Sequence, residues 1–505
     1  MIKNLQAAVK HYWEENPLLL ILLLGGFFRL LAVLFSKGYG MYDDQYFVVE
    51  VAQSWVDGND YYSWLPGSKD VQVMGHHYLY ACIHYVMFSA MKVMGMFDPQ
   101  FKMYIIRFIH AALSMITIYC GYQIAHYYGG KRAARETGLL LAIFFIFPFL
   151  SVRTLFETTP IPFLVLACWL LIKTQDQATW KQGILAGLCF AFAFALRLQL
   201  AFFFAGLGIA LLLTKQWKQI GGILIGFILM TLLIQFSTDM LIFGKPFVQI
   251  AKYIEYNRNN AETFGISPWY KYLLFVGGML IPPMSVLLVV GFFVGIRKRW
   301  ILFLPTLLFF VFHSYFPNKQ ERFILPALPF LIIAGVLGWN ELMDASKSAF
   351  PRKFKRIAWI VFLALNTLPL FAISTTYSKR SMVEAMYYLY NDKNAGPFVL
   401  EQSTKESNLF MPVYYAGKWN KQYYVNTSNS VAAVWKNAKS SNEWPTHVLF
   451  FEEDKLQSRV DSFKRYFPNI TYETKIEPSF IDKLMHTLNP INANYEAVIY
   501  RIHYN

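Results

Sequence analysis

Runs of about 20 apolar residues recur in this 505-residue chain from Leu18 to Ser374, and they restrict its fold more than any other feature. A helix of about 20 such residues can cross a lipid bilayer. Only 15% of the residues are charged. The pattern therefore predicts an all-α polytopic membrane protein. Eleven spans are predicted, at 18–36, 104–126, 134–150, 158–173, 183–197, 199–214, 219–237, 271–296, 300–316, 322–341 and 356–375.

Short basic loops between these spans predict the orientation of the chain. The loops are Lys131–Arg135, Lys173 to Lys181, Lys215–Lys218, Arg297–Arg299 and Arg352–Arg356. With a cytoplasmic N-terminus, all five lie on the cytoplasmic side, where basic loops concentrate. This count treats 76–96, which carries three histidines and Lys92, as a segment lying in the outer interface. The alternative is a twelfth span with inverted topology.

The composition also excludes several classes of protein. The net charge of +15 is spread over short loops, so no separate basic domain for nucleic acid is expected. The four cysteines all lie in apolar segments without CxxC spacing, which argues against a disulfide framework or a metal site. No Walker-A or GxGxxG motif is present. The first apolar run lacks a small-residue cleavage site and is expected to remain as a signal anchor.

The chain changes character at residue 377. Residues 1–376 form the predicted transmembrane module, whereas 377–505 are mixed and polar. A helical pattern over Arg380–Asp392 is followed by short strand-like runs such as PFVLEQ, HVLFFEE and YEAVIYRI. We therefore expect a C-terminal soluble α/β domain on the non-cytoplasmic side.

Four polar stretches fall on the same outer side in this topology. They are YDDQYF (Tyr42–Phe47), SVRTLFETTP (Ser151–Pro160), LRLQ (Leu196–Gln199) and the segment around Lys319–Arg322. Ionisable groups at membrane depth usually line a water-filled cavity and are functional. The sequence thus predicts one outer cavity that collects acids and cations from distant parts of the chain.

Several of these side chains have a structural as well as a functional interpretation. Adjacent Asp43 and Asp44 form either a solvated loop or a general base acting on a hydroxyl. Arg153 and Glu157 have the i,i+4 spacing of a helix-end ion pair. Arg197, between two apolar runs, either extends to the interface or serves the cavity.

The last polar stretch, FHSYFPNKQERFILPALPF, places ionisable groups directly before a span. They are His313, Lys319, Glu321 and Arg322. A carboxylate facing several cations suits the transfer of a group from an anionic leaving group, because the cations stabilise the charge that grows as it departs.

This last stretch resembles the His-Lys-Glu-Glu-Arg-Phe segment of glycosyltransferase family 22, the mannosyltransferases of lipid-linked oligosaccharide and glycosylphosphatidylinositol (GPI) assembly that use dolichol-phosphate mannose. Four other stretches resemble family motifs in the same order, so the resemblance covers about 40–340. They are DDQYF, SVRTLFETTP, ALRLQLAF, and FGKPFVQIAKYIEYN with GISPWYKYL. Departures are Asn318, Gln320 and Gln45, where the family has His, Glu and a second acid, and Leu198-Gln199 in place of Pro-Thr.

The resemblance implies a GT-C glycosyltransferase fold with a long first external loop that carries the catalytic acid. It implies inverting transfer of a sugar, with mannose favoured, from a polyprenyl-phosphate donor to a glycolipid or lipid-linked glycan, without nucleotide, metal or other cofactor. Asp44 aligns with the catalytic acid, and Asp43 is its substitute. The donor phosphate is assigned to Lys319 and Arg322 with Arg197 and Arg153.

The remaining assignments are supporting roles. Glu321 is expected to orient Arg322, and Trp269 and Tyr270 to stack on a sugar or guide the lipid chain; Glu157 and His313 complete the predicted site. Two alternatives stay open: a polytopic transporter or lipid flippase, and a GT-C transferase acting on lipid A or protein. The expected location is a bacterial inner membrane rather than the endoplasmic reticulum, with the site and the C-terminal domain outside the cytoplasm.

Overall fold

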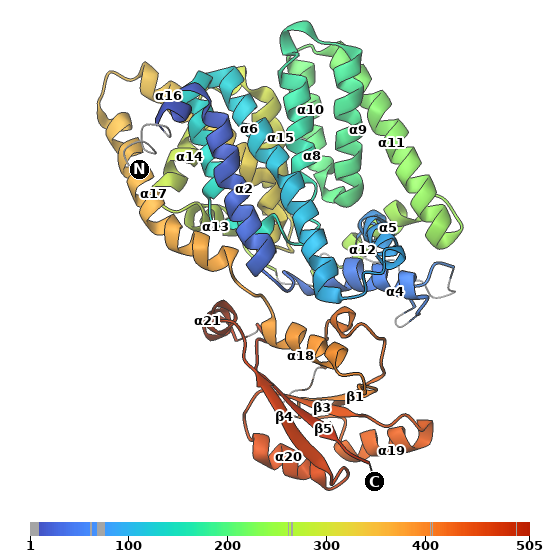
Figure 1. The fold of residues 1–505 in the computed structure, drawn as a ribbon. Helices are drawn as coiled ribbons and strands as arrows, with labels where there is room; N and C mark the ends of the chain where they lie inside the picture. The colour runs from blue at the N-terminus through green and yellow to red at the C-terminus, as the bar shows by residue number, and fades with distance from the viewer. Residues whose placement is uncertain are drawn as a thin grey trace. The chain divides into compact units, whose positions relative to one another are not determined.

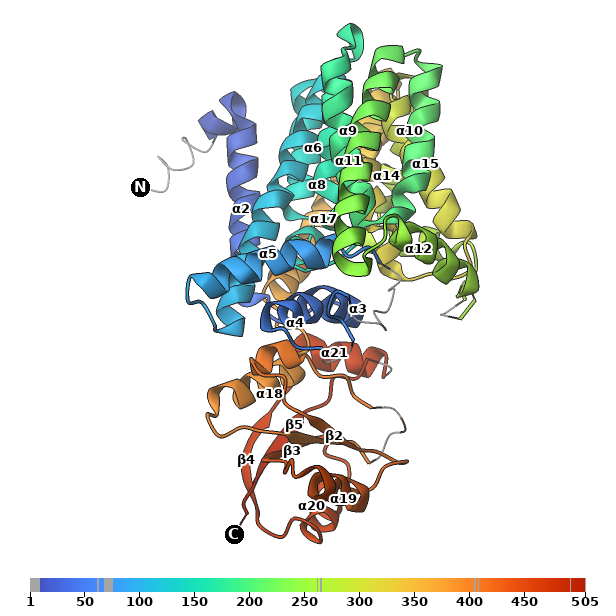
Figure 2. The same cartoon turned by 90° about the vertical axis from the view of Figure 1, so that its right-hand side faces the viewer.

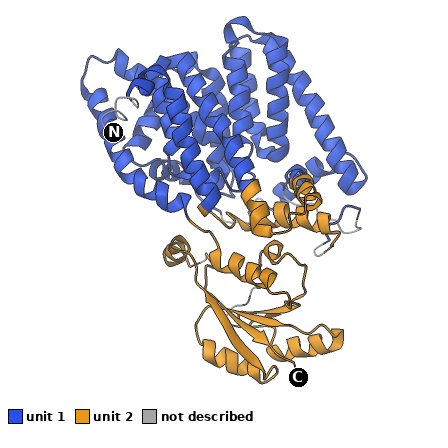
Figure 3. Cartoon of the chain, viewed as in Figure 1, with its two compact units in different colours: residues 1–34, 63–83, 106–375 blue, residues 35–62, 84–105, 376–505 orange. Residues whose placement is uncertain are grey.

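The computed structural model describes residues 10–60, 63–67, 76–260, 262–263, 266–403, 406, 408–490 and 492–504. The chain forms two compact units, coloured separately in Figure 3. Unit 1 comprises 1–34, 63–83 and 106–375. Unit 2 comprises 35–62, 84–105 and 376–505.

Unit 1 is a bundle of helices (Figure 1). Its long or apolar helices are α2 (Pro17–Phe35), α6 (Pro99–Ile143), α8 (Ile161–Ile172), α9 (Trp180–Leu196), α10 (Ala201–Leu213), α11 (Trp217–Phe243), α15 (Trp300–Tyr315), α16 (Leu328–Ala345) and α17 (Phe350–Ser374). Shorter helices are α7 (Ile146–Leu150), α12 (Val248–Asn259), α13 (Lys271–Met279) and α14 (Met284–Phe292). Segments of 3₁₀ helix are η2 (Gln175–Gln177), η3 (Leu198–Leu200), η4 (Ile296–Lys298) and the longer η5 (Glu321–Ala327).

Three predicted spans differ in detail from these helices. The span predicted at 134–150 forms the last part of α6, which ends at Ile143. A kink at Gly130, with φ 66° and ψ −168°, separates this part from the preceding part of α6. The span predicted at 271–296 is wrong as one helix, because Ile281 has φ 57° and two prolines follow it, so α13 ends at Met279 and α14 starts at Met284. The span predicted from 158 starts as α8 only at Ile161.

Among the residues that the structure describes, five helical segments are long and apolar enough to cross a membrane: Pro17–Phe35, Pro99–Ile143, Trp217–Phe243, Glu321–Ala345 and Phe350–Ser374. Apolar helices of 10–17 residues lie at several of the other predicted spans, among them Ile161–Ile172 and Trp300–Tyr315. The helices thus agree with a multi-pass membrane protein. The count of eleven spans and the interfacial position of 76–96 stay predictions.

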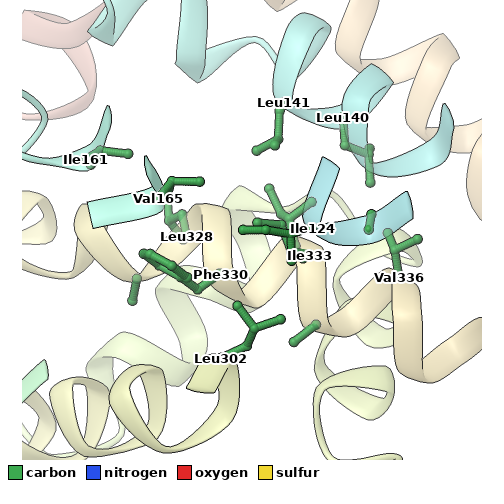
Figure 4. Close-up of a cluster of buried hydrophobic side chains, with 14 of the residues drawn as sticks. Ile124, Leu140, Leu141, Ile161, Val165, Leu302, Leu328, Phe330, Ile333 and Val336 are labelled. Carbon is green, nitrogen blue, oxygen red and sulfur yellow. The ribbon is translucent and has the colours of Figure 1, made fainter. Parts of the chain in front are cut away.

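The core of unit 1 is a continuous cluster of buried aliphatic and aromatic side chains. Figure 4 shows one part of it, where Leu328, Phe330 and Ile333 of α16 lie among Ile124 and Val165 of other helices. Between α14 and α16 the backbones themselves touch. A Cβ on Gly338 would lie 1.8 Å from the carbonyl oxygen of Gly291. Small residues allow such close packing between helices in lipid.

Unit 2 contains a five-stranded sheet in the order β2-β1-β3-β5-β4. The strands are β1 (Phe398–Glu401), β2 (Gln422–Val425), β3 (His447–Phe451), β4 (Ile470–Ile476) and β5 (Ala497–Ile502). β1 pairs parallel with β2 and β3, whereas β5 pairs antiparallel with β3 and β4. The predicted α/β character of the C-terminal region is therefore confirmed.

Helices cover the sheet of unit 2 on both faces (Figure 2). Val434 of α19 (Val431–Ser441) and Phe463 of α20 (Leu456–Lys464) join Val399, Val448 and Phe450 of the strands in one core cluster. The helix α18 (Arg380–Asn391) packs on β4 and β5, and η6 (Val413–Ala416) packs against α18. The helix α21 (Phe480–Leu488) follows β4.

Unit 2 also contains the loop that follows α2. This loop forms α3 (Tyr42–Asp44), the π-helix η1 (Gln45–Glu50) and α4 (Val51–Asp57), and the unit includes most of α5 (Leu79–Val93). Gly38 pairs with Ser378, whose amide donates to the carbonyl oxygen of Lys37 at 3.0 Å. Gly38 has φ 77°, and a Cβ there would lie 1.8 Å from the Ser378 carbonyl oxygen, so only glycine fits. The first loop and the C-terminal sheet thus belong to one compact body.

Candidate functional site

A buried cluster of ionised side chains lies in unit 1, where three chain segments meet. Arg197 follows the end of α9 in an extended conformation, with φ −148° and ψ 97°, so its side chain leaves the helix at the turn into η3. Arg322 lies in η5, and Glu157 lies in the turn before α8. The Glu157 carboxylate is 2.7 Å from Nη1 of Arg197 and 3.5 Å from Nε of Arg322.

All three side chains are nearly excluded from solvent, with exposures of 1%, 3% and 7% for Glu157, Arg197 and Arg322. Burial raises the pKa of Glu157, but the charges of Arg197, Arg322 and His76 outweigh this effect and leave the pKa below its ordinary value. Glu157 is therefore ionised at neutral pH. One carboxylate faces two guanidinium groups, so the cluster keeps a positive charge that suits an incoming phosphate.

Two glutamines complete the cluster. Oε1 of Gln199 accepts a hydrogen bond from Arg197 at 2.5 Å and lies 3.4 Å from Nε2 of His313. Oε1 of Gln320 accepts one from Arg322 at 2.9 Å. These two positions are departures from the family motifs, and in the structure each holds the arginine two residues away.

The other ionisable residues of the stretch at 313–322 lie beside this cluster. Lys319 is buried, and its ammonium donates to the carbonyl oxygens of Ser267 at 2.9 Å and Phe316 at 2.5 Å. Glu321 is 58% exposed and pairs with Lys271 at 2.9 Å. Glu157 thus provides a carboxylate to Arg322. That Glu321 orients Arg322 stays a prediction.

Arg153 is buried near a second polar group in unit 1. Its guanidinium lies 4.6 Å from the Phe149 ring centroid. It lines a small cavity of about 30 Å³ with His110 and Thr159. Thr159 donates to the Tyr80 hydroxyl at 2.8 Å, and that hydroxyl lies 2.6 Å from Nε2 of His110.

An apolar groove of about 700 Å³ shares the segment η5 with the ion cluster. Ile324 and Ala327 on its wall belong to η5, as Arg322 does, and Leu328 and Leu331 belong to α16. The rest of the wall comes from α13, α14 and α15, and Trp269 lies at its edge with 65% of its surface exposed. Tyr270 is 46% exposed. A groove with almost no polar lining suits a hydrocarbon chain.

The predicted catalytic acids lie in unit 2. Asp44 ends α3 and is 1% exposed, whereas Asp43 is partly exposed. The π-helix η1 starts directly after Asp44. Such wide turns are rare and often occur at functional sites. That Asp44 shares one cavity with the arginines of unit 1 stays a prediction from the sequence.

Glu50, at the end of η1, is a buried acid that sequence reasoning missed. It is 1% exposed and accepts hydrogen bonds from the Gln45 side chain at 3.0 Å and from the Tyr414 amide at 2.8 Å. The Tyr414 ring stacks on Phe88, and Lys102 lies over both rings. Glu50 thus joins the segment that carries Asp44 to the C-terminal sheet domain.

Burial raises the pKa of Glu50 to about 8, although its two hydrogen bonds lower it in part. A raised pKa in the folded state favours the protonated acid, so stability should fall as pH rises from about 4.5 to about 8 and then level off. The neutral Glu50→Gln variant should lose this dependence on pH. Its free energy of unfolding at pH 9, relative to its value at low pH, should therefore fall by a few kcal/mol less than that of the unchanged protein. Thermal midpoints from pH 5 to 9 measure it.

Glu406→Gln is the control for this prediction, because Glu406 is an exposed acid in the same unit. Its curve should follow that of the unchanged protein. Parallel curves for Glu50→Gln and the unchanged protein would contradict the assignment. Hydrogen exchange at Tyr414, corrected for the intrinsic effect of pH, locates the change.

Comparison with known proteins gives matches over most of the chain. A model of the Alg9-like mannosyltransferase family matches residues 20–420. GPI mannosyltransferase 3 of Candida glabrata is 26% identical over 300 residues, which cover 54% of this chain and 45% of that protein. Mannosyltransferase APTG1 of Arabidopsis thaliana is 24% identical over 488 residues, 85% of this chain and 84% of that protein. The chain spans about half the length of the first of these relatives.

Two solved structures share the fold. ArnT from Cupriavidus metallidurans bound to undecaprenyl phosphate has a TM-score of 0.63 at 11% identity, covering 97% of this chain and 98% of that one. AglB from Archaeoglobus fulgidus, in complex with an inhibitory peptide and a dolichol-phosphate, has a TM-score of 0.50 at 10% identity, covering 90% and 71%. The predicted GT-C fold is therefore confirmed.

Proposed function

Because this chain belongs to the Alg9-like mannosyltransferase family, we propose that it is a membrane glycosyltransferase that moves a sugar from a polyprenyl-phosphate donor to a hydroxyl of a glycolipid or lipid-linked glycan. Mannose is the favoured sugar, since the named relatives are mannosyltransferases. Transfer inverts the anomeric carbon, needs no metal or other cofactor, and takes place on the non-cytoplasmic face.

One observation in unit 1 carries this proposal. Two buried arginines are held by Glu157, and η5, which carries one of them, also lines an apolar groove. A lipid phosphate has the matching composition, an anionic head on a hydrocarbon chain. Arg197 and Arg322 would bind the phosphate and stabilise its charge as the glycosidic bond breaks. The groove would hold the chain.

In this proposal, the general base of the reaction is a carboxylate of the first loop. Asp44 would take the proton of the acceptor hydroxyl as its oxygen attacks the anomeric carbon, and polyprenyl phosphate would leave. Lys319 and Arg153 are proposed to add positive charge around the phosphate. The solved structures of ArnT bound to undecaprenyl phosphate and of AglB in complex with a dolichol-phosphate support a lipid-phosphate donor.

The transporter alternative predicts no chemistry and can be separated by one assay. The purified protein in lipid nanodiscs is given labelled polyprenyl-phosphate mannose and a glycolipid acceptor. We expect free polyprenyl phosphate and a mannosylated product of opposite anomeric configuration, with or without EDTA. Intact donor after long incubation would contradict the proposal. Replacing the glycolipid with lipid A or protein tests the other alternative.

The named relatives come from eukaryotes and lend no support to a bacterial inner membrane.

The groove can be tested separately with a glycine that lines it. A Cβ on Gly277 meets nothing within 4 Å, so Gly277→Phe should fold normally and narrow the groove. We expect the KM for a long-chain donor to rise about tenfold, roughly the loss of two buried CH₂ groups, and that for a short-chain donor to change little. Gly208→Phe on α10, equally open but outside the groove, is the control. Equal KM values of the two variants for the long-chain donor would exclude this groove as the binding site of the donor chain.

A further inference from the structure

The helix α21 in unit 2 is amphipathic with its apolar side outward. Phe480, Leu484 and Leu488 lie four residues apart and form one stripe along the helix. They are 78%, 43% and 70% exposed, and neighbouring Met485 is 45% exposed. Four exposed large apolar side chains on a helix of nine residues form a patch of the kind that marks an interaction surface.

The polar side of α21 faces its own unit and is fixed there. Asp482 is the buried residue of the helix. Its carboxylate accepts from the backbone amide of Arg380 at 3.1 Å, and its carbonyl oxygen accepts from Asn494 at 3.0 Å. Ser479 caps the helix by accepting from the Asp482 amide. These contacts hold the apolar stripe away from the sheet domain.

Only a few residues of chain connect unit 2 to the ends of two membrane-length helices. α2 ends at Phe35 and α17 ends at Ser374. The pairing of Gly38 with Ser378 lies three residues after α2 and four after α17, which is at most about 14 Å of extended chain. Arg380, which bonds Asp482, is two residues further.

The exposed apolar side chains in the last turns of α17 indicate that this part of the helix faces lipid. Leu365, Leu368 and Phe371 are 57%, 77% and 47% exposed in the last turns of this apolar helix. The hydrocarbon boundary therefore lies close to Ser374.

We propose that α21 lies in the outer interface of the bilayer, with Phe480, Leu484 and Leu488 inserted among the lipids. A short helix with aromatic and aliphatic residues on one side and polar contacts on the other is typical of such interfacial helices. The lipid surface is then a binding partner of the C-terminal domain. This anchor fixes the domain, and the first loop joined to it, at the depth of the headgroups. The inference rests on the membrane topology of the chain and not on the proposed transfer reaction.

Spin labels on the full-length protein in phosphatidylcholine–phosphatidylglycerol nanodiscs test this proposal. The four native cysteines are replaced, and single cysteines are placed at Leu484 and Leu488. Controls are Lys483, on the same helix but off the stripe, and Lys464, exposed on α20. Interfacial insertion predicts that the ratio of collision with oxygen to collision with a water-soluble nickel chelate is at least threefold higher on the stripe.

Two results would overturn the proposal. Equal ratios at the stripe and the controls would mean that α21 faces water. Immobilised labels protected from both reagents would mean that the stripe packs against protein.

A second variant keeps the native cysteines. In nanodiscs, Leu484→Asn with Leu488→Asn should increase hydrogen exchange of 480–488 about tenfold, whereas Lys483→Asn should change it less than twofold. Equal exchange in both variants would also overturn the insertion. All of these measurements are independent of donor or acceptor, so inactivity of the enzyme cannot mimic them.

Discussion

Asp44→Asn should reduce sugar transfer by about 10²–10⁴-fold, the usual effect of removing a general base. Asparagine keeps the size of the side chain but cannot accept the proton of the acceptor hydroxyl. The KM for the polyprenyl-phosphate donor should change little, because the cations assigned to the phosphate are untouched. Initial rates in nanodiscs, with a thermal midpoint for each variant, measure the effect.

Asp43→Asn is the matched control for this substitution. Asp43 is the adjacent acid on the same helix but is partly exposed, whereas Asp44 is 1% exposed. We expect a loss of less than tenfold for Asp43→Asn. A normally folded Asp44→Asn protein with undiminished transfer would refute the assignment, and a larger loss for Asp43→Asn would exchange the two roles.

Glu157→Ala should have the largest effect on stability. It leaves Arg197 and Arg322 buried without the carboxylate that they share at 2.7 and 3.5 Å. Removing one partner of a buried ion pair costs about 3–5 kcal/mol, since the remaining charge is neither solvated nor paired. The thermal midpoint should fall by several degrees, and donor affinity should fall because the guanidinium groups are no longer held.

Glu321→Ala is the control for this cluster. Glu321 also pairs with a cation, Lys271 at 2.9 Å, but it is 58% exposed. Exposed ion pairs contribute about 1 kcal/mol or less, so the midpoint should hardly change. Equal midpoints for the two variants would show that the buried cluster does not stabilise the protein, and we would then withdraw it as an organising element of the site.

Much of the fold was predictable from hydrophobicity alone. In lipid, a backbone segment must satisfy its own hydrogen bonds, so an apolar run of sufficient length becomes a helix. The runs at 18–36, 219–237 and 356–375 therefore match α2, α11 and α17. The prediction of one helix over 271–296 was wrong because composition averages over a local break, which the backbone at Ile281 introduces.

The candidate site was predictable as a set of residues but not as a set of contacts. Glu157, Arg197 and Arg322 were selected because charge in an apolar setting is costly and usually functional. Gln199 and Gln320 were noted only as departures from family motifs, although each accepts a hydrogen bond from an arginine of the cluster. Glu50 had no signal at all, because its importance comes from the amide of Tyr414, far away in the chain.

By itself, the sequence determined which segments are helices of a multi-pass membrane protein, where the polar stretches interrupt them, and to which family of motifs they belong. These properties are local, since apolar length and residue spacing can be read along the chain. Only the tertiary structure decided that Glu157 pairs with Arg197 and Arg322, that η5 also lines an apolar groove, and that the first loop and the C-terminal sheet form one unit. Such pairings depend on how distant segments pack, and the energy of a buried charge depends on the neighbours that packing provides.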